Sequence, residues 1–191
     1  MTHAAFIATD VETTGVRMWG PNADKLLQVC MIAVDEDLNP VDDGINVIIK
    51  PFDIDGAYHL AVPFVQEMHT ATGLWAQLEQ GYTMPQAARV IGKYLDGHTN
   101  EETKGLPQYQ RELKMLGSSV KMDYNFIEKF MPSVMQHLSY QVIDVSSIAI
   151  LSRKWMGLPR FKKMSTHAPE DDINETLMEL RWLREQGVFR L

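Results

Sequence analysis

Three short apolar runs near the start of the chain precede longer segments in which apolar residues recur at helical spacing. The runs are rich in Val, Ile, Leu and Met and are bounded by Gly, Pro, Asn and Asp, a pattern typical of buried strands. The predicted strands are Phe6–Asp10, Leu26–Asp35 and Gly44–Ile49. Turn-forming residues at 37–40 join the second strand to the third, so we expect the three strands to form a meander.

Helices are expected over most of the remaining chain, where apolar residues three and four positions apart would share one buried face. The predicted helices are Val62–His69, Met84–Leu95, Tyr124–Met131, Ser146–Trp155 and Asp171–Glu185, with shorter helical segments at Leu74–Gln80 and Met135–Leu138. Gln141–Val145 is predicted as a further strand, and the polar residues 97–114 as a mobile loop. Strands first and α/β alternation later predict an α/β fold, a mixed sheet flanked by helices.

Composition limits the class of protein. A length of 191 residues suits a single domain, residues 1–191, and the 45% hydrophobic content argues against disorder. No apolar run approaches the roughly 20 residues of a membrane span, and no secretory signal pattern opens the chain, so we expect a cytoplasmic protein with no membrane partner. The single Cys30 lies in the apolar run Val29–Val34 and is expected to be a buried core thiol.

The net charge of −7 bears on nucleic-acid binding. Proteins that hold long nucleic acids usually carry a basic face, because phosphate neutralisation supplies most of their affinity. The sequence has no stripe of lysine and arginine of that kind. A protein of this charge that held a nucleic acid would depend on metal ions and a small pocket, which favours very short oligonucleotides.

Carboxylates supply the most informative chemistry. Asp10 ends the first predicted strand and Glu12 follows two residues later, and residues two apart in extended chain point to the same face. Two adjacent anions in an apolar setting are costly unless a cation neutralises them. Oxygen ligands of this type suit Mg²⁺ or Mn²⁺ rather than zinc.

Two later segments add to this acidic set. Asp123 lies where small residues lead into a predicted helix. On its local sequence alone, it is equally an ordinary acid at the start of a helix. His167 precedes the last predicted helix, with Thr166 as its expected cap and Asp171 and Asp172 in its opening turn. A histidine that deprotonates water beside carboxylate-held ions would suit a metal-assisted hydrolase.

These residues carry a resemblance to the DEDDh 3'-to-5' exonucleases, and within them to the oligoribonuclease family. Asp-x-Glu near the N-terminus, a mid-chain Asp and His-x4-Asp at the last helix form that motif set. Asp10–Gly15 is similar to the family's D-x-E-M-T-G, Met68–Leu74 to T-H-S-x-x-G-L, Gly117–Asp123 to G-N-S-I-G-Q-D, Tyr140–Ser147 to Y-R-x-x-D-V-S-T and Phe161–His167 to F-K-K-x-x-T-H. Single blocks are weak signals, but five blocks in the right order over nearly the whole chain are strong.

The resemblance implies a ribonuclease H-like fold with a five-stranded mixed sheet and a two-metal-ion exoribonuclease. Its implied ligands for two Mg²⁺ or Mn²⁺ ions are Asp10, Glu12, Asp123 and Asp172, with His167 as the general base. His-x4-Asp spacing favours Asp172 over Asp171. The substrate residues that it implies are Thr13, Val16, Phe64, His69, Ser119, Tyr140, Gln141, Ser146 and Ser147, where Phe64, His69 and Tyr140 stack on or flank bases and the serines contact phosphate. It also implies a homodimer in which Tyr140 reaches into the partner's active site.

The chain departs from the family pattern mainly where the substrate would be held. Thr13 replaces a methionine, Val16 a leucine wedge and Phe64 a stacking tryptophan, and an extra stretch, Met18–Asn22, lengthens the loop. Gln141 replaces an arginine of the 5'-phosphate pocket. Gln28 and Ser118 also replace a glutamate and an asparagine of the family.

The sequence therefore predicts a 3'-to-5' exoribonuclease that converts RNA of two to a few nucleotides to 5'-mononucleotides. The altered pocket leaves open a less length-restricted exonuclease acting on single-stranded RNA or DNA. A binding module of nuclease fold that has lost activity is a remote alternative, since the five catalytic residues are all present.

Overall fold

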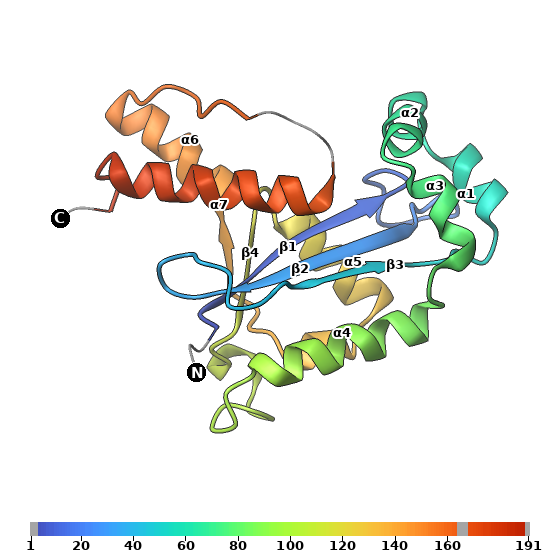
Figure 1. The fold of residues 1–191 in the computed structure, drawn as a ribbon, viewed down its shortest axis with the longest axis horizontal. Helices are drawn as coiled ribbons and strands as arrows, with labels where there is room; N and C mark the ends of the chain where they lie inside the picture. Colours follow the sequence, from blue (N-terminus) through green and yellow to red (C-terminus); the bar gives the residue numbers. More distant parts are fainter. Residues whose placement is uncertain (1–3, 164–167, 190–191) are drawn as a thin grey trace.

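A five-stranded sheet forms the centre of the molecule in the computed structural model, which describes residues 4–163 and 168–189 (Figure 1). The strands are β1 (Phe6–Thr13), β2 (Leu26–Val34), β3 (Ile45–Ile48), β4 (Lys114–Gly117) and β5 (Val142–Asp144). Their order is β3-β2-β1-β4-β5. The first three strands pair antiparallel, which confirms the predicted meander, whereas β4 and β5 continue the sheet in parallel from β1. The predicted mixed sheet is therefore confirmed.

Helices cover both faces of this sheet. They are α1 (Ile54–Leu60), α2 (Pro63–Ala71), α3 (Leu74–Gln77), α4 (Met84–His98), α5 (Lys121–Phe130), α6 (Val145–Met156) and α7 (Pro169–Glu185), with short 3₁₀ turns η1 (Leu78–Gln80), η2 (Gln108–Gln110) and η3 (Val134–Gln136). In Figure 1, α7 crosses one face of the sheet beside α6, α4 lies against the opposite face, and α1, α2 and α3 gather at one end. No helix within the described residues is long and apolar enough to cross a membrane.

The alternation of side chains along β1 divides the core in two. Ile7 and Val11 pack into the larger core with residues of α4 and α5, whereas Ala8 packs with residues of α6 and α7. Cys30, 1% exposed, belongs to this second core, as predicted. Asp10 and Glu12 follow Ala8 at two-residue steps, so both carboxylates face the side of the sheet that α7 covers.

Two elements were not predicted. β4 is a four-residue strand at the end of the segment predicted as a loop, and three of its residues are buried, so it lacks a polar–apolar alternation. α1 is one short helix capped by Asp53, whose side chain accepts a hydrogen bond from the backbone N–H of Gly56. Both elements are too short for periodicity to reveal them.

The boundaries of α7 correct one prediction. The helix begins at Pro169, and its N-cap is Ala168, which has no side chain that could cap it. The prediction that Thr166 caps this helix is therefore wrong, and Thr166 itself lies outside the described residues. The expected acidic opening turn is confirmed by Glu170, Asp171 and Asp172.

Candidate active site

Three carboxylates from opposite ends of the chain converge beside β1. Asp10 and Glu12 project from β1, and Asp172 projects from the first turn of α7. Ligand-capable atoms of the three side chains all lie within 4.8 Å of one another. Asp172 rather than its neighbour Asp171 is thus the acid that α7 contributes to the cluster.

Asp123 is held against the same stretch of β1. It lies in the first turn of α5, is only 2% exposed, and its Oδ1 accepts a hydrogen bond of 2.9 Å from the backbone N–H of Val11. Val11 separates Asp10 from Glu12, so this bond ties α5 to the strand that carries both acids. Among the described residues, the 4.8 Å group consists of the other three carboxylates, but the charge of Asp123 still raises the pKa of Glu12.

Crowding and burial make these acids hard to ionise. Burial, reinforced by the charge of Asp172, raises the pKa of Asp10 to about 7, against a lowering effect of Lys163. Burial and then the charges of Asp10, Asp172 and Asp123 raise the pKa of Glu12 to about 8. The pKa of Asp123 is also raised well above its ordinary value, chiefly by burial.

This donor set fits a divalent cation. Convergent oxygen ligands are those preferred by Mg²⁺ and Mn²⁺, and a bound cation would favour the ionised form of each acid. Lys163 is too weak an influence to neutralise them, since the pKa of Asp10 stays raised despite it. The carboxylate geometry therefore supports the predicted metal-binding role.

The predicted general base, His167, lies outside the described residues, so its position relative to the carboxylates stays a prediction. The described residues nearest to it in sequence are Lys163 and Ala168. The charge of Lys163 lowers the pKa of Asp10, and Ala168 is the N-cap of α7, the helix that carries Asp172.

His69 holds the end of β1 in place. This side chain is 0% exposed, and its Nε2 lies 2.9 Å from the carbonyl oxygen of Thr13. Burial lowers the pKa of His69. Because a carbonyl oxygen accepts, Nε2 donates to Thr13, whereas Nδ1 lies 3.8 Å from Glu12 Oε2 and has no hydrogen-bond partner within the described residues. The ring has no exposed surface that could meet a base in this conformation, and it lies where it holds the carbonyl of Thr13.

The other expected base contacts lie at the surface. Val16 is 72% exposed, Phe64 65% and Tyr140 54%, and each is therefore accessible to a ligand. Thr13 is buried, and its hydroxyl donates to the carbonyl of Gly15.

The expected phosphate contacts form one hydrogen-bonded group around Asp144. Ser119, Ser146 and Ser147 are called the serine group. Oδ1 of Asp144 accepts from the backbone N–H groups of Ser119 and Ser146 at 2.9 and 3.1 Å, and Oδ2 accepts from the Ser147 hydroxyl at 2.8 Å. The Ser146 hydroxyl lies 2.9 Å from that of Ser118 and 3.2 Å from that of Ser119. Gln141 is exposed on the segment leading into β5, and its backbone N–H donates to the Ser139 hydroxyl.

Sequence reasoning missed Asp24, which fixes the loop carrying Val16. Asp24 is 2% exposed, accepts from the Thr14 hydroxyl at 2.9 Å and accepts from the backbone N–H of Arg17 at 2.6 Å. A Cβ atom on Gly15 would come within 2.8 Å of its carboxylate, so only glycine fits there. No local pattern distinguishes Asp24 from an ordinary turn acid, because its partners come from the far side of the loop.

It also missed a chain of side-chain hydrogen bonds that crosses the sheet. Gln28 pairs with Glu12 in the β1–β2 register, and its amide donates to Asn46 Oδ1 at 2.7 Å. Asn46 Nδ2 in turn donates to Glu170 Oε1 at 3.2 Å, in the first turn of α7. The chain of contacts thus links β2 and β3 to the turn that carries Asp172.

Solved structures share this fold. One is Escherichia coli exonuclease I in complex with a 5cy-dT13 oligonucleotide, with a TM-score of 0.67 and 17% identity over 98% of this chain and 42% of that one. Another is the Mg²⁺- and Mn²⁺-bound form of Schizosaccharomyces pombe Pop2p, with a TM-score of 0.64 and 14% identity over 96% of this chain and 84% of that one. The structure therefore has a ribonuclease H-like fold, with a cluster of carboxylates beside β1.

Sequence relatives specify the family. The chain is 33% identical to the oligoribonuclease of Streptomyces coelicolor over 94% of its own length and 84% of the relative's. It is 32% identical to the oligoribonuclease of Tropheryma whipplei over 96% of its own length and 94% of the relative's. No protein-family model matches the sequence. The chain belongs to the oligoribonuclease family, and it is a metal-dependent 3'-to-5' exoribonuclease.

Proposed function

We propose that this enzyme hydrolyses RNA of two to a few nucleotides to 5'-mononucleotides with two metal ions. The observation that carries the proposal is the convergence of Asp10, Glu12 and Asp172, with Asp123 bonded to the strand between the first two. Crowded carboxylates with raised pKa values are typical of a site built for bound cations.

The roles of the residues follow from their chemistry. Asp10, Glu12, Asp123 and Asp172 would hold two Mg²⁺ or Mn²⁺ ions, which supply positive charge to orient water and to stabilise the phosphorane. His167 accepts the proton of the attacking water. His69 and Asp24 keep the strand end and its loop in place, as their buried hydrogen bonds to Thr13, Thr14 and Arg17 indicate.

Short RNA is favoured because the expected contacts with a strand are a few exposed apolar side chains and hydroxyls. Val16 and Phe64 are exposed apolar side chains able to contact bases, and the hydroxyls of Ser119, Ser146 and Ser147 are able to contact phosphate. The net charge of −7 gives little general attraction for a long strand.

A less length-restricted exonuclease is the second candidate, and one observation favours it. Gln141 is exposed and carries no charge, so a terminal 5'-phosphate would lack the charge-assisted contact of the family's arginine.

A 5'-labelled series of RNA and DNA strands from two to about ten nucleotides tests both candidates. We expect hydrolysis in Mg²⁺ or Mn²⁺, none in excess EDTA, and a kcat/KM that falls as the RNA lengthens beyond a few nucleotides. Asp172→Asn should abolish hydrolysis, whereas the adjacent exposed Asp171→Asn should not, which makes it a matched control. Equal rates on all lengths would support the second candidate, and hydrolysis in EDTA would exclude the metal mechanism.

We also propose a homodimer in which Tyr140 completes the partner's active site. Tyr140 is 54% exposed on the segment leading into β5, which leaves its ring accessible to a second copy. Mixing Tyr140→Ala protein with His167→Ala protein should restore activity, because one site of the mixed dimer is whole. An enzyme that sediments as a fully active monomer would contradict this. The cytoplasmic location expected from the sequence also stays a prediction, which cell fractionation would test.

A further inference from the structure

A basic pocket opens beside the serine group, between α6, α7 and the segment that follows α6. Its volume is about 530 Å³. Four cationic side chains line it: Arg153, Arg160, Lys162 and Lys163. In a chain of net charge −7, four cations around one pocket are a local reversal of sign.

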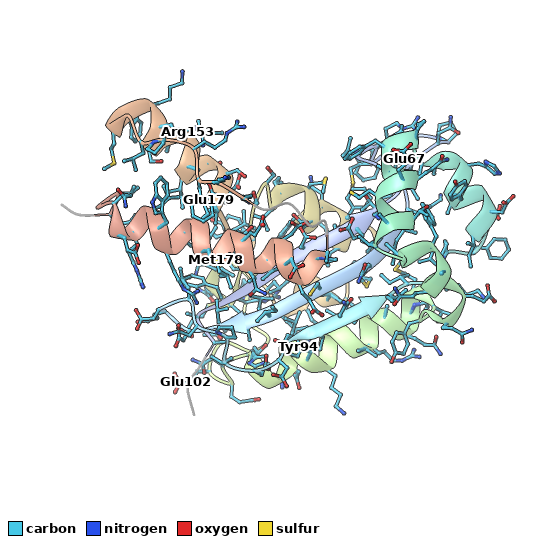
Figure 2. All side chains as sticks on the ribbon, turned by 45° about the horizontal axis from the view of Figure 1, so that its top comes forward. Glu67, Tyr94, Glu102, Arg153, Met178 and Glu179 are labelled. Carbon is cyan, nitrogen blue, oxygen red and sulfur yellow. The ribbon has the colours of Figure 1, made fainter. Side chains whose placement is uncertain are left out.

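Three of these cations have no side-chain partner among the described residues. Lys163 Nζ lies 3.4 Å from Oε2 of Glu179, the acid among the described residues that line the pocket. Over the described ranges, the side chains of Arg153, Arg160 and Lys162 form no hydrogen bond or ion pair. Figure 2 shows Arg153 on α6 and Glu179 on α7 at the same end of the molecule. Like charges gathered without partners destabilise a fold unless an anion binds among them.

The pocket continues the site that was assigned to phosphate. Ser146, Ala149, Ile150 and Arg153 line it from α6 at the spacing that places residues on one helix face. Ser146 belongs to the serine group, whereas Arg153 lies seven residues, or about 10 Å, further along the helix at 1.5 Å per residue. Gly157 then ends α6 in a left-handed conformation, φ +69°, and the following segment brings Arg160 and Lys162 to the same pocket.

We infer that this basic pocket binds the oligonucleotide phosphate that lies one nucleotide further 5' than the phosphate held by the serine group, with Arg153 as its main contact. The inference rests on the proposed function, and it deepens it. A dinucleotide with a 5'-phosphate reaches only the serine group, whereas strands with a further phosphate gain a contact to a forked guanidinium. The ligand chemistry is a phosphate, either the terminal 5'-phosphate of a trinucleotide or the internal diester of a tetranucleotide.

The test compares wild type, Arg153→Gln and Lys154→Gln. Lys154 is the neighbouring exposed cation of α6 and does not line the pocket, so its variant controls for the loss of one charge. The substrates are synthetic RNAs: pNpN, pNpNpN and NpNpNpN. Removal of Arg153 should lower the ratio of kcat/KM for pNpNpN to that for pNpN about tenfold, the effect of one charge-assisted hydrogen bond. Lys154→Gln should leave the ratio at its wild-type value.

The substrate arms separate the two sources of phosphate. A loss confined to pNpNpN assigns the pocket to a terminal phosphate, and a loss that includes NpNpNpN assigns it to the strand backbone. Equal losses on pNpN and pNpNpN, an unchanged ratio, or the same loss in Lys154→Gln would each overturn the inference.

Binding measurements keep the inference separate from the proposed function. Fluorescence anisotropy of the labelled strands in EDTA measures affinity without hydrolysis. Arg153→Gln should weaken trinucleotide binding relative to dinucleotide binding, and the slope of log affinity against log salt should fall by about 0.7 for the trinucleotide. If wild type hydrolyses none of the RNAs in Mg²⁺, the proposed function fails, while the anisotropy ratio still decides whether the pocket binds phosphate.

Discussion

The carboxylate cluster and the basic pocket lie next to each other and carry opposite charge. Asp10, Glu12 and Asp172 are held within 4.8 Å of one another by a strand and a helix, and Glu12 is nearly buried. Arg153, Arg160 and Lys162 line an open pocket through long side chains, and no side-chain hydrogen bond or ion pair fixes them within the described part of the chain. Among the described residues, Lys163 belongs to both regions, since it lines the pocket and lowers the pKa of Asp10.

The difference reflects the ligands that each region suits. A small divalent ion demands closely set oxygen ligands, so the acids come from rigid elements and are bonded in place, as Asp123 is to Val11. A phosphate on a flexible strand tolerates variable geometry, so cations on long side chains suffice. Changes in the acidic cluster should therefore abolish activity, and changes around the phosphate sites should alter substrate preference.

Asp10→Asn tests the rigid region and should have the largest effect. It removes one charged ligand from a cluster that has no substitute nearby, so hydrolysis of every RNA should fall below detection in Mg²⁺. The same change relieves repulsion, so the variant should melt at a slightly higher temperature than wild type in EDTA. Hydrolysis assays and thermal melts measure the two effects, and residual activity close to wild type would refute the assignment.

His167→Ala should lower kcat by about 10² to 10⁴ with a much smaller change in KM, because a general base acts in the transition state. Steady-state kinetics between about pH 6 and 9 measure this effect. His137→Ala is a suitable control, since His137 lies on the other side of the sheet, near Asp96. Near-wild-type turnover across that pH range would contradict the assignment.

Gln141→Arg tests the phosphate sites by adding a charge on the exposed segment that leads into β5. We expect binding of 5'-phosphorylated dinucleotides to tighten by about 1–2 kcal/mol, the value of a charge-assisted hydrogen bond. Dinucleotides with and without 5'-phosphate, measured by anisotropy in EDTA, give the comparison. Strict 5'-phosphate dependence already present in wild type would mean that a cation of the basic pocket serves this phosphate.

Magnesium should stabilise the fold more at about pH 8 than at about pH 5.5, which is the smallest effect. The pKa values of Asp10 and Glu12 are raised to about 7 and about 8, so the folded state holds these protons more tightly than the unfolded chain. Stability of the metal-free protein therefore falls as pH rises from about 4 to about 8 and stays low above. Bound Mg²⁺ offsets the charge, so its gain in melting temperature is largest where both acids are ionised. Equal gains at both pH values would contradict the prediction.

Local pattern was sufficient for the parts of the fold that carry a strong period. The apolar runs that became β1 and β2 and the amphipathic α4 and α7 were found in this way. β4 was missed because Lys114–Gly117 is short and buried without alternation, and its place depends on pairing with β1. α1 was missed for the same reason, because its 7 residues are too few to show a helical period.

Asp10 and Glu12 were predictable because residues two apart on a strand share a face. Asp123 and the choice of Asp172 over Asp171 came from the resemblance to the DEDDh exonucleases. The residues that support these acids were not predictable. Asp24, His69 and Gln28 act through contacts with residues distant in sequence, and Arg153 gains meaning only from the pocket that α7 and residues 160–163 complete. Tertiary proximity of this kind leaves no periodic signal.

The origin of the cluster in β1 and α7, the first strand and the last helix described, has a consequence for the maturation of the enzyme. During synthesis Asp10 and Glu12 leave the ribosome long before Asp172, and closing so long a loop is a late, entropically costly step of folding. A growing or partly folded chain therefore holds an incomplete set of ligands. Cleavage of RNA begins only when α7 docks on the sheet, so catalytic activity reports the completion of folding.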